Sequence, residues 1–198
     1  MSWGFCYIAE QRDLAAAVRQ IVGRFAAAGI FVRNPDTKRI TRLTEEGDQQ
    51  EVTETELFDV AAQQAQLTFQ LWFSGAADVV CSLRSLKSGL VCHTYSIQGF
   101  SATERDKIVR CCIEYFKFGA GERTAVWLVV DPSGETGDID WDQVVLNERI
   151  FPPRLPSVLG LPWSRLSKLS IPAGWSAVRL GHVALISERA AFPPTPGV

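Results

Sequence analysis

The sequence has few of the residues and motifs from which common active sites are built. It contains two histidines, His93 and His182, and one methionine among 198 residues. It contains no G-x-S-x-G, H-E-x-x-H or P-loop motif, the usual signals of serine hydrolases, zinc proteases and P-loop nucleotidases. Cys92 and His93 cannot form a dyad with each other, because adjacent side chains on a strand point to opposite faces. The sequence therefore predicts no catalytic residue and no cofactor.

Long apolar runs, paired cysteines and a strong net charge are also missing. No run approaches the ~20 apolar residues that span a bilayer, and no basic segment followed by an apolar core opens the chain. The formal net charge of −2 argues against broad binding to nucleic acid. We therefore expect a cytoplasmic protein without a membrane or nucleic-acid partner. No C-x-x-C pair occurs, so we expect five buried, reduced thiols: Cys6, Cys81, Cys92, Cys111 and Cys112.

Residues 90–131 form the clearest structural unit, with a strand, a capped helix and a second strand. Ser101 and Glu104 have the spacing of a capping box, and apolar residues recur at helical period over 108–116. Gly119 is predicted to end the helix. The apolar stretch 124–130 is typical of a buried strand. The two strands of this unit could run parallel or antiparallel, and the sequence does not decide between them.

The rest of the chain alternates short strands with helices. Asp13 is predicted to cap a helix over 14–29. Residues 39–43 alternate charged and apolar side chains, as an exposed edge strand does. The polar stretch 44–56 is interpreted as a loop that leads into a short helix. Further strands are predicted at 3–8 and in an antiparallel meander over 67–100.

Prolines dominate the last third of the chain. Pro152, Pro153, Pro156, Pro162 and Pro172 predict irregular segments with one short helix near 164–169. A closing hairpin or two successive strands are predicted over 175–187. The predicted fold is α+β: a mostly antiparallel sheet with two main helices packed on one face and an irregular, proline-rich C-terminal third. Residues 1–190 are predicted to form one domain, and 191–198 a flexible tail.

The loop after the buried strand carries the strongest candidate binding site. A calcium loop does not fit, because Gln143 and Arg149 stand where the sixth-position glycine and the twelfth-position glutamate belong. No metal site is therefore predicted. The aspartates could cap the next helix, or the loop could present an aromatic anchor with an acidic rim to a protein partner. The candidate partner-binding residues are Glu135, Asp138, Asp140, Trp141 and Asp142.

In overall texture the chain resembles the immunity proteins of bacterial polymorphic toxin systems. The resemblance lies in TFQLWFSGAADVVCSLRS, YSIQGFSATERDKIV and VVDPSGETGDIDWDQVV, within residues 67–146. It implies a non-enzymatic, cytoplasmic domain that binds and neutralises a cognate toxin. Two alternatives remain open at this point. The chain could be a small enzyme with a non-standard site near His93 or the 138–142 loop, or an adaptor subunit of a larger assembly.

Overall fold

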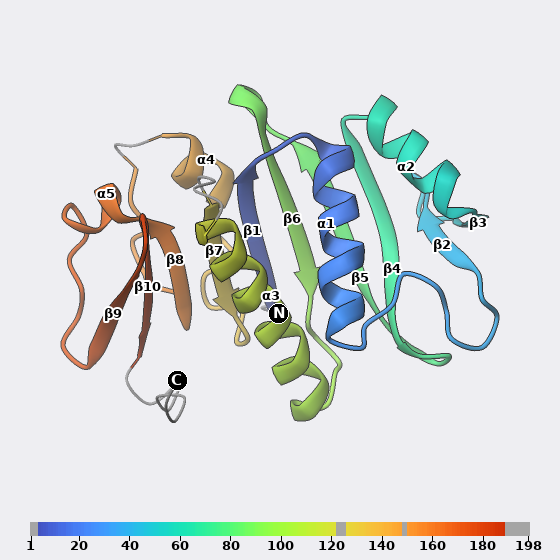
Figure 1. The fold of residues 1–198 in the computed structure, drawn as a ribbon. Coiled ribbons are helices and arrows are strands. Elements are labelled where there is room, and N and C mark those ends of the chain that lie inside the picture. The colour runs from blue at the N-terminus through green and yellow to red at the C-terminus, as the bar shows by residue number, and fades with distance from the viewer. Residues whose placement is uncertain (1–3, 122–125, 148–149, 189–198) are drawn as a thin grey trace.

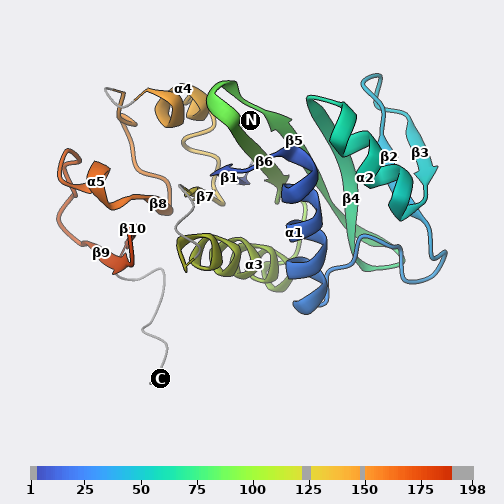
Figure 2. The same ribbon diagram turned by 45° about the horizontal axis from the view of Figure 1, so that its top comes forward.

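All the strands in the part of the chain that the structure describes belong to a single antiparallel sheet. The structure, a computed structural model, describes residues 4–121, 126–147 and 150–188 (Figure 1). Within these residues ten strands follow the order β3-β2-β4-β5-β6-β1-β7-β8-β10-β9, and five α-helices pack against them. Each strand is antiparallel to its neighbours, so the predicted α+β class with a mostly antiparallel sheet is confirmed. Figure 2 shows β3 and β9 at opposite ends of the sheet.

The first strand lies at the centre of the sheet. β1 (Phe5–Gln11) pairs with β6 (Leu90–Ser96) on one side and with β7 (Val126–Asp131) on the other, antiparallel in both cases. The strands β6 and β7 therefore run parallel to each other without touching, which answers the question that the sequence left open. The predicted meander is also confirmed: β4 (Gln66–Ser74), β5 (Ala77–Ser85) and β6 pair in order.

Three helices cover one face of the sheet. α1 (Leu14–Ala27), α2 (Glu54–Gln63) and α3 (Ala102–Gly121) bury their apolar stripes against the strands in the larger hydrophobic core. The predicted caps of α1 and α3 are confirmed: Asp13 Oδ1 accepts from the Ala16 amide at 2.7 Å, and Ser101 Oγ accepts from the Glu104 amide at 3.4 Å. The predicted end of α3 was wrong, because Gly119 lies inside the helix, where an added Cβ atom would be in ordinary van der Waals contact with Val126.

The polar stretch after residue 43 contains a strand that the sequence did not predict. β2 (Ile40–Leu43) is not the sheet edge, because β3 (Gln49–Val52) pairs along its outer side. The expected loop over 44–56 was therefore wrong for these four residues. β3 has no alternation of apolar and polar side chains, so its sequence cannot be told from that of a solvated loop.

The C-terminal third also contains more regular structure than its prolines predicted. β8 (Val158–Pro162) pairs with β7, and a short helix, α5 (Trp163–Leu166), follows it. The hairpin of β9 (Trp175–Leu180) and β10 (Val183–Glu188) is confirmed and joins the sheet through β8. β8 is only five residues long, so it fits after Pro156 and ends at Pro162. The predicted tail, 191–198, lies outside the described residues.

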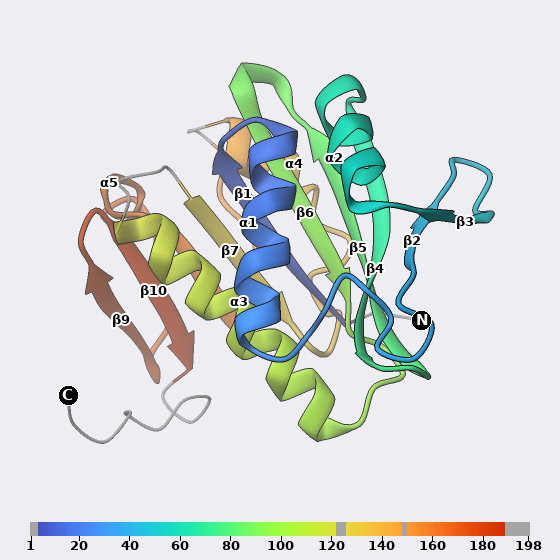
Figure 3. The same ribbon diagram turned by 45° about the vertical axis from the view of Figure 1, so that its right-hand side comes forward.

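A smaller core lies on the other face of the sheet. α4 (Trp141–Leu146) packs there on side chains of β1, β7 and β8. Figure 3 shows α1 and α3 in front of β1 and β6, and α4 behind these strands. This second face is open over β5 and β6, where no helix is described. All five cysteines are free and buried, as predicted. None of the described helices is both long and apolar enough to cross a membrane.

Candidate functional site

A broad cavity lies on the face of the sheet that α1, α2 and α3 leave uncovered. Its volume is about 940 Å³, and it is bounded by β1, β5 and β6 and by the loop that joins β7 to α4. Side chains with hydroxyl groups line the strands, including Ser82, Thr94 and Ser96. Four carboxylates and two guanidinium groups also line the cavity: Glu135, Asp138, Asp140, Asp142, Arg84 and Arg154. We call this region the open-face cavity.

The loop that forms one wall of the open-face cavity is held in place by Asp131 at the end of β7. The buried Asp131 carboxylate accepts four hydrogen bonds, from the Ser133 hydroxyl, the Gly134 amide and both the amide and the hydroxyl of Thr136, at 2.6–2.9 Å. Burial alone would raise the pKa of Asp131, but these hydrogen bonds outweigh it and lower that pKa. The loop therefore leaves the sheet in a fixed conformation.

Gly4 lets the same loop lie directly on the start of β1. A Cβ atom at residue 4 would stand 2.5 Å from the carbonyl oxygen of Pro132, a distance that real Cβ atoms do not reach. The close approach therefore requires glycine here. Together with Asp131, it brings the 134–142 segment against the sheet face instead of leaving it in solvent.

Asp142 connects this loop to the strands beneath it. Its Oδ1 accepts from the Tyr7 hydroxyl at 3.0 Å, and its Oδ2 accepts from Nε and Nη2 of Arg84 at 3.1 and 2.6 Å. Burial is the main cause that raises the pKa of Tyr7, and the Asp142 carboxylate adds to it. The Tyr7 hydroxyl therefore stays protonated and acts as a hydrogen-bond donor.

All five residues that the sequence singled out line the open-face cavity, but they differ in exposure. Glu135, Asp138 and Asp140 are exposed, and Asp142 is partly buried in its contacts with Tyr7 and Arg84. Asp138 pairs with Arg154, and Asp140 Oδ1 caps α4 by accepting from the Gln143 amide. Trp141 is only 5% exposed and packs in the second core, so it fixes α4 to the sheet and is not an exposed anchor.

The sequence did not identify the basic and hydroxyl side chains that complete the cavity. Arg84 lies 58 residues before Asp142, and Arg154 lies 16 residues after Asp138, so no local spacing connects them. The alternation along β5 was a partial signal that Ser82 and Arg84 share the uncovered face of the sheet, because they alternate with the buried Cys81 and Leu83.

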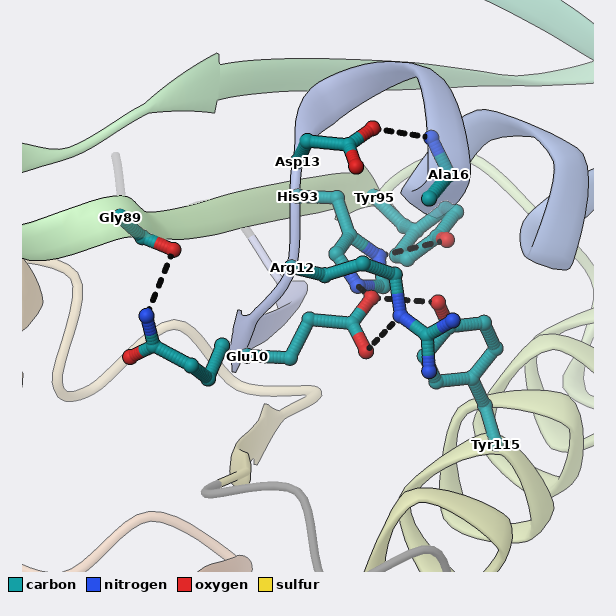
Figure 4. Close-up of polar contacts among 9 residues, drawn as sticks. Glu10, Arg12, Asp13, Ala16, Gly89, His93, Tyr95 and Tyr115 are labelled. Carbon is teal, nitrogen blue, oxygen red and sulfur yellow. Dashed lines mark hydrogen bonds and ion pairs between the residues drawn. The ribbon is translucent and has the colours of Figure 1, made fainter.

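A second group of ionisable side chains is buried on the helix-covered face (Figure 4). Glu10, on β1, accepts from the Tyr115 hydroxyl of α3 at 2.5 Å and pairs with Arg12 Nε at 3.2 Å. Its Oε1 also lies 3.6 Å from His93 Nε2, while His93 Nδ1 is 2.8 Å from the Tyr95 hydroxyl. Burial raises the pKa of Glu10, but the contacts with His93, Tyr115 and Arg12 together lower it below its ordinary value.

These buried contacts do not form an accessible reaction centre. Glu10 and His93 are both fully buried, and neither lines a described cavity. The histidine ring is enclosed by Tyr95 and Tyr115 in edge-on contacts, with ring centroids 5.6 and 5.1 Å away. The group joins β1, β6 and α3 through polar contacts inside an otherwise apolar core, which is a structural role. Among the described residues, no group of three or more metal-ligating side chains is placed to hold an ion.

Comparison with protein-family models, with curated proteins and with solved structures finds no match to this chain.

Proposed function

We propose that this protein is a non-enzymatic binding domain that holds a protein partner on its open-face cavity. The observation that carries the proposal is the position of the 134–142 loop. It is fixed by Asp131 and tied to the sheet by Asp142, and it walls a cavity of about 940 Å³. A preformed concave surface of this kind loses little conformational entropy when a partner binds.

The charges on the cavity indicate the chemistry of the partner. Four carboxylates against two guanidinium groups leave an excess of negative charge on a chain that is nearly neutral overall. Glu135, Asp138 and Asp140 are the exposed members, so they meet an approaching partner first. A basic protrusion of a partner protein suits this surface, because complementary charge speeds association and selects against acidic partners.

An immunity protein is the function class that fits these features best. Such a protein binds a cognate toxin inside the cytoplasm and blocks its active site or its access to substrate. The chain resembles such proteins in texture over residues 67–146, and one of the three stretches that carry the resemblance contains the loop at the cavity wall. We propose a protein as the partner, and we propose no binding to nucleic acid or to a membrane.

The enzyme alternative near His93 is less well supported by the geometry. His93 is fully buried, and its ring packs against Tyr115 of α3. In the 138–142 loop, Asp138 pairs with Arg154, Asp140 caps α4, and Asp142 pairs with Arg84 and Tyr7. Each of these carboxylates therefore has a structural contact that accounts for its position without a catalytic role.

Co-expression with the protein encoded by the adjacent reading frame tests the proposal. We expect that protein to stop growth of the host when it is expressed alone, and this chain to restore growth through a complex of fixed stoichiometry. A harmless neighbour, or restored growth without a complex, would contradict the immunity function.

A further inference from the structure

The two ends of the sheet differ in how their outer edges are protected. β3 is four residues long and mostly polar, and its Glu51 pairs with Arg39 at 2.7 Å. Short strands and charged side chains are the usual means by which proteins discourage pairing at a sheet edge. β9 has six residues and pairs along one side only, with β10, among the described strands. Its Val178 is 55% exposed, the largest exposed fraction among the large apolar side chains of the described residues.

The register of the hairpin shows which backbone groups of β9 face outward. Leu180 pairs with Val183 across the two-residue turn at 181–182, where Gly181 has φ 61°. The residues that flank such a turn are a hydrogen-bonded pair, and hydrogen-bonded pairs alternate along antiparallel strands. Leu180, Val178 and Ser176 therefore direct their amides toward β10. The amides and carbonyls of Ala177 and Arg179 and the carbonyl of Trp175 point away from the sheet, whereas the Trp175 amide donates to the Pro172 carbonyl at 3.2 Å.

The side chains of β9 are complementary to those of a second β9 strand that runs antiparallel to it. Trp175 and Arg179 are four residues apart and so lie on the same face of the sheet, on either side of Ala177. The Arg179 guanidinium already lies over the Trp163 ring, 4.7 Å from its centroid. A two-fold axis at Ala177 would place Trp175 of one chain opposite Arg179 of the other, and Ser176 opposite Val178.

We propose that β9 pairs antiparallel with β9 of a second copy of this chain, about a two-fold axis at Ala177. The pairing satisfies the outward amides of Ala177 and Arg179 and the outward carbonyls of Trp175 and Ala177 with about four backbone hydrogen bonds in total. Each Arg179 guanidinium then lies between Trp163 of its own chain and Trp175 of the second copy, a cation–π arrangement on both sides. Each Val178 is covered by its cross-strand neighbour.

When β9 pairs with a second copy of itself, the aromatic Trp175 faces the cationic Arg179, and the polar Ser176 faces the apolar Val178. A second copy therefore fits this edge better than an unrelated strand. No like charges face each other across the axis. The contact is small, below about 1,200 Å² in total, which places the dimer among weak, transient complexes. The surface is separate from the open-face cavity, and the inference does not depend on the proposed function.

Sedimentation velocity over a concentration series of about 5–500 µM tests the dimer with Ala177→Pro and Ala177→Val. The outward amide of Ala177 makes no bond to β10, so proline removes an intermolecular donor and leaves the hairpin ladder intact. The valine variant has similar bulk and keeps the amide. We expect wild type and Ala177→Val to dimerise, and Ala177→Pro to dimerise at least about tenfold more weakly. Monomeric wild type at all concentrations, or equal dimerisation of all three, overturns the proposal.

A cross-linking experiment tests the register and does not depend on whether the proline variant folds. All five native thiols are buried, so Ala177→Cys introduces an accessible thiol at the proposed axis. Paired Cα atoms about 5.5 Å apart are within disulfide reach, and mild oxidation with glutathione disulfide should give a covalent dimer. The matched control is Ser176→Cys, whose two copies are offset by two residues and lie more than about 7 Å apart. Equal cross-linking of both variants, or of neither, contradicts the proposed pairing.

Discussion

Arg84 and Asp142 are joined by two hydrogen bonds to one carboxylate oxygen, at 3.1 and 2.6 Å, although 58 residues separate them in sequence. The Tyr7 hydroxyl holds the other oxygen of the same carboxylate. One side chain thus ties the start of α4 to β5 and to the central strand β1. The open-face cavity keeps its shape because its loop and its strands share this contact.

Removing this ion pair should cost a modest amount of stability. The side chain of Arg84 is 48% exposed and that of Asp142 is 22% exposed, so water screens much of their attraction. We expect a double-mutant cycle of Arg84→Ala and Asp142→Ala to give a coupling of about 0.5–1.5 kcal/mol in urea unfolding. The Arg39–Glu51 pair is the matched control, because both of its side chains are more than 60% exposed. Its coupling should be close to zero, and equal couplings would contradict this account.

Glu10 should make the protein sensitive to acid. Its pKa in the folded state lies below the ordinary value, so its stabilising contribution is complete above about pH 4.5 and is lost as the pH falls through the lowered pKa. We expect Glu10→Gln to lower the free energy of unfolding by about 2–4 kcal/mol at pH 7, because Arg12 and Tyr115 lose their charged partner.

The pH dependence separates this effect from a simple loss of packing. The difference between wild type and Glu10→Gln should shrink steadily below about pH 4, where the wild-type carboxylate also becomes protonated. Thermal unfolding followed by circular dichroism from about pH 3 to 7 measures it. A difference that stays constant over this range would show that the Glu10 charge contributes nothing.

Gly160 of β8 should not tolerate a side chain. A Cβ atom there would stand 2.5 Å from the Phe116 ring of α3, in the packed core. We expect Gly160→Ala to destabilise the protein by about 1–3 kcal/mol through overpacking. In α1, Gly23→Ala is the matched control, because nothing lies within 4 Å of the added Cβ. Alanine has the higher helix propensity, so this control should be stabilising by about 0.5–1 kcal/mol in chemical unfolding. Equal losses from both substitutions would rule out the proposed close packing of β8 on α3.

Local sequence signals predicted those parts of the fold that depend on local interactions. The capping residues Asp13 and Ser101 each mark a helix start, because a cap is a contact within four residues. The meander follows from alternation and glycine-containing turns. The strand β3 and the position of β1 between β6 and β7 were not predictable, because strand order is set by long-range pairing that one sequence does not encode in any local pattern.

The candidate site, like the fold, was predictable only where it depends on local sequence. The acidic loop stands out in the sequence, and all five residues chosen from it line one cavity. Trp141 was expected to be an exposed anchor, but it is buried. An indole in a loop can point inward or outward, and the packing of α4 on β7 and β8 decides which. Tyr7, Arg84 and Arg154 come from three distant segments, so nothing in their spacing connects them to the loop.

The central claim, that the open-face cavity binds a protein partner, is tested most directly by reversing one exposed charge on each face of the molecule. Glu135 lines the cavity, whereas Glu114 lies on α3 on the opposite face, and both are exposed glutamates. The measurement is a calorimetric titration of Glu135→Arg and Glu114→Arg with the protein encoded by the adjacent reading frame. The proposal predicts at least about tenfold weaker binding for Glu135→Arg and unchanged binding for Glu114→Arg. Equal affinity for both variants would show that the partner does not contact the open-face cavity.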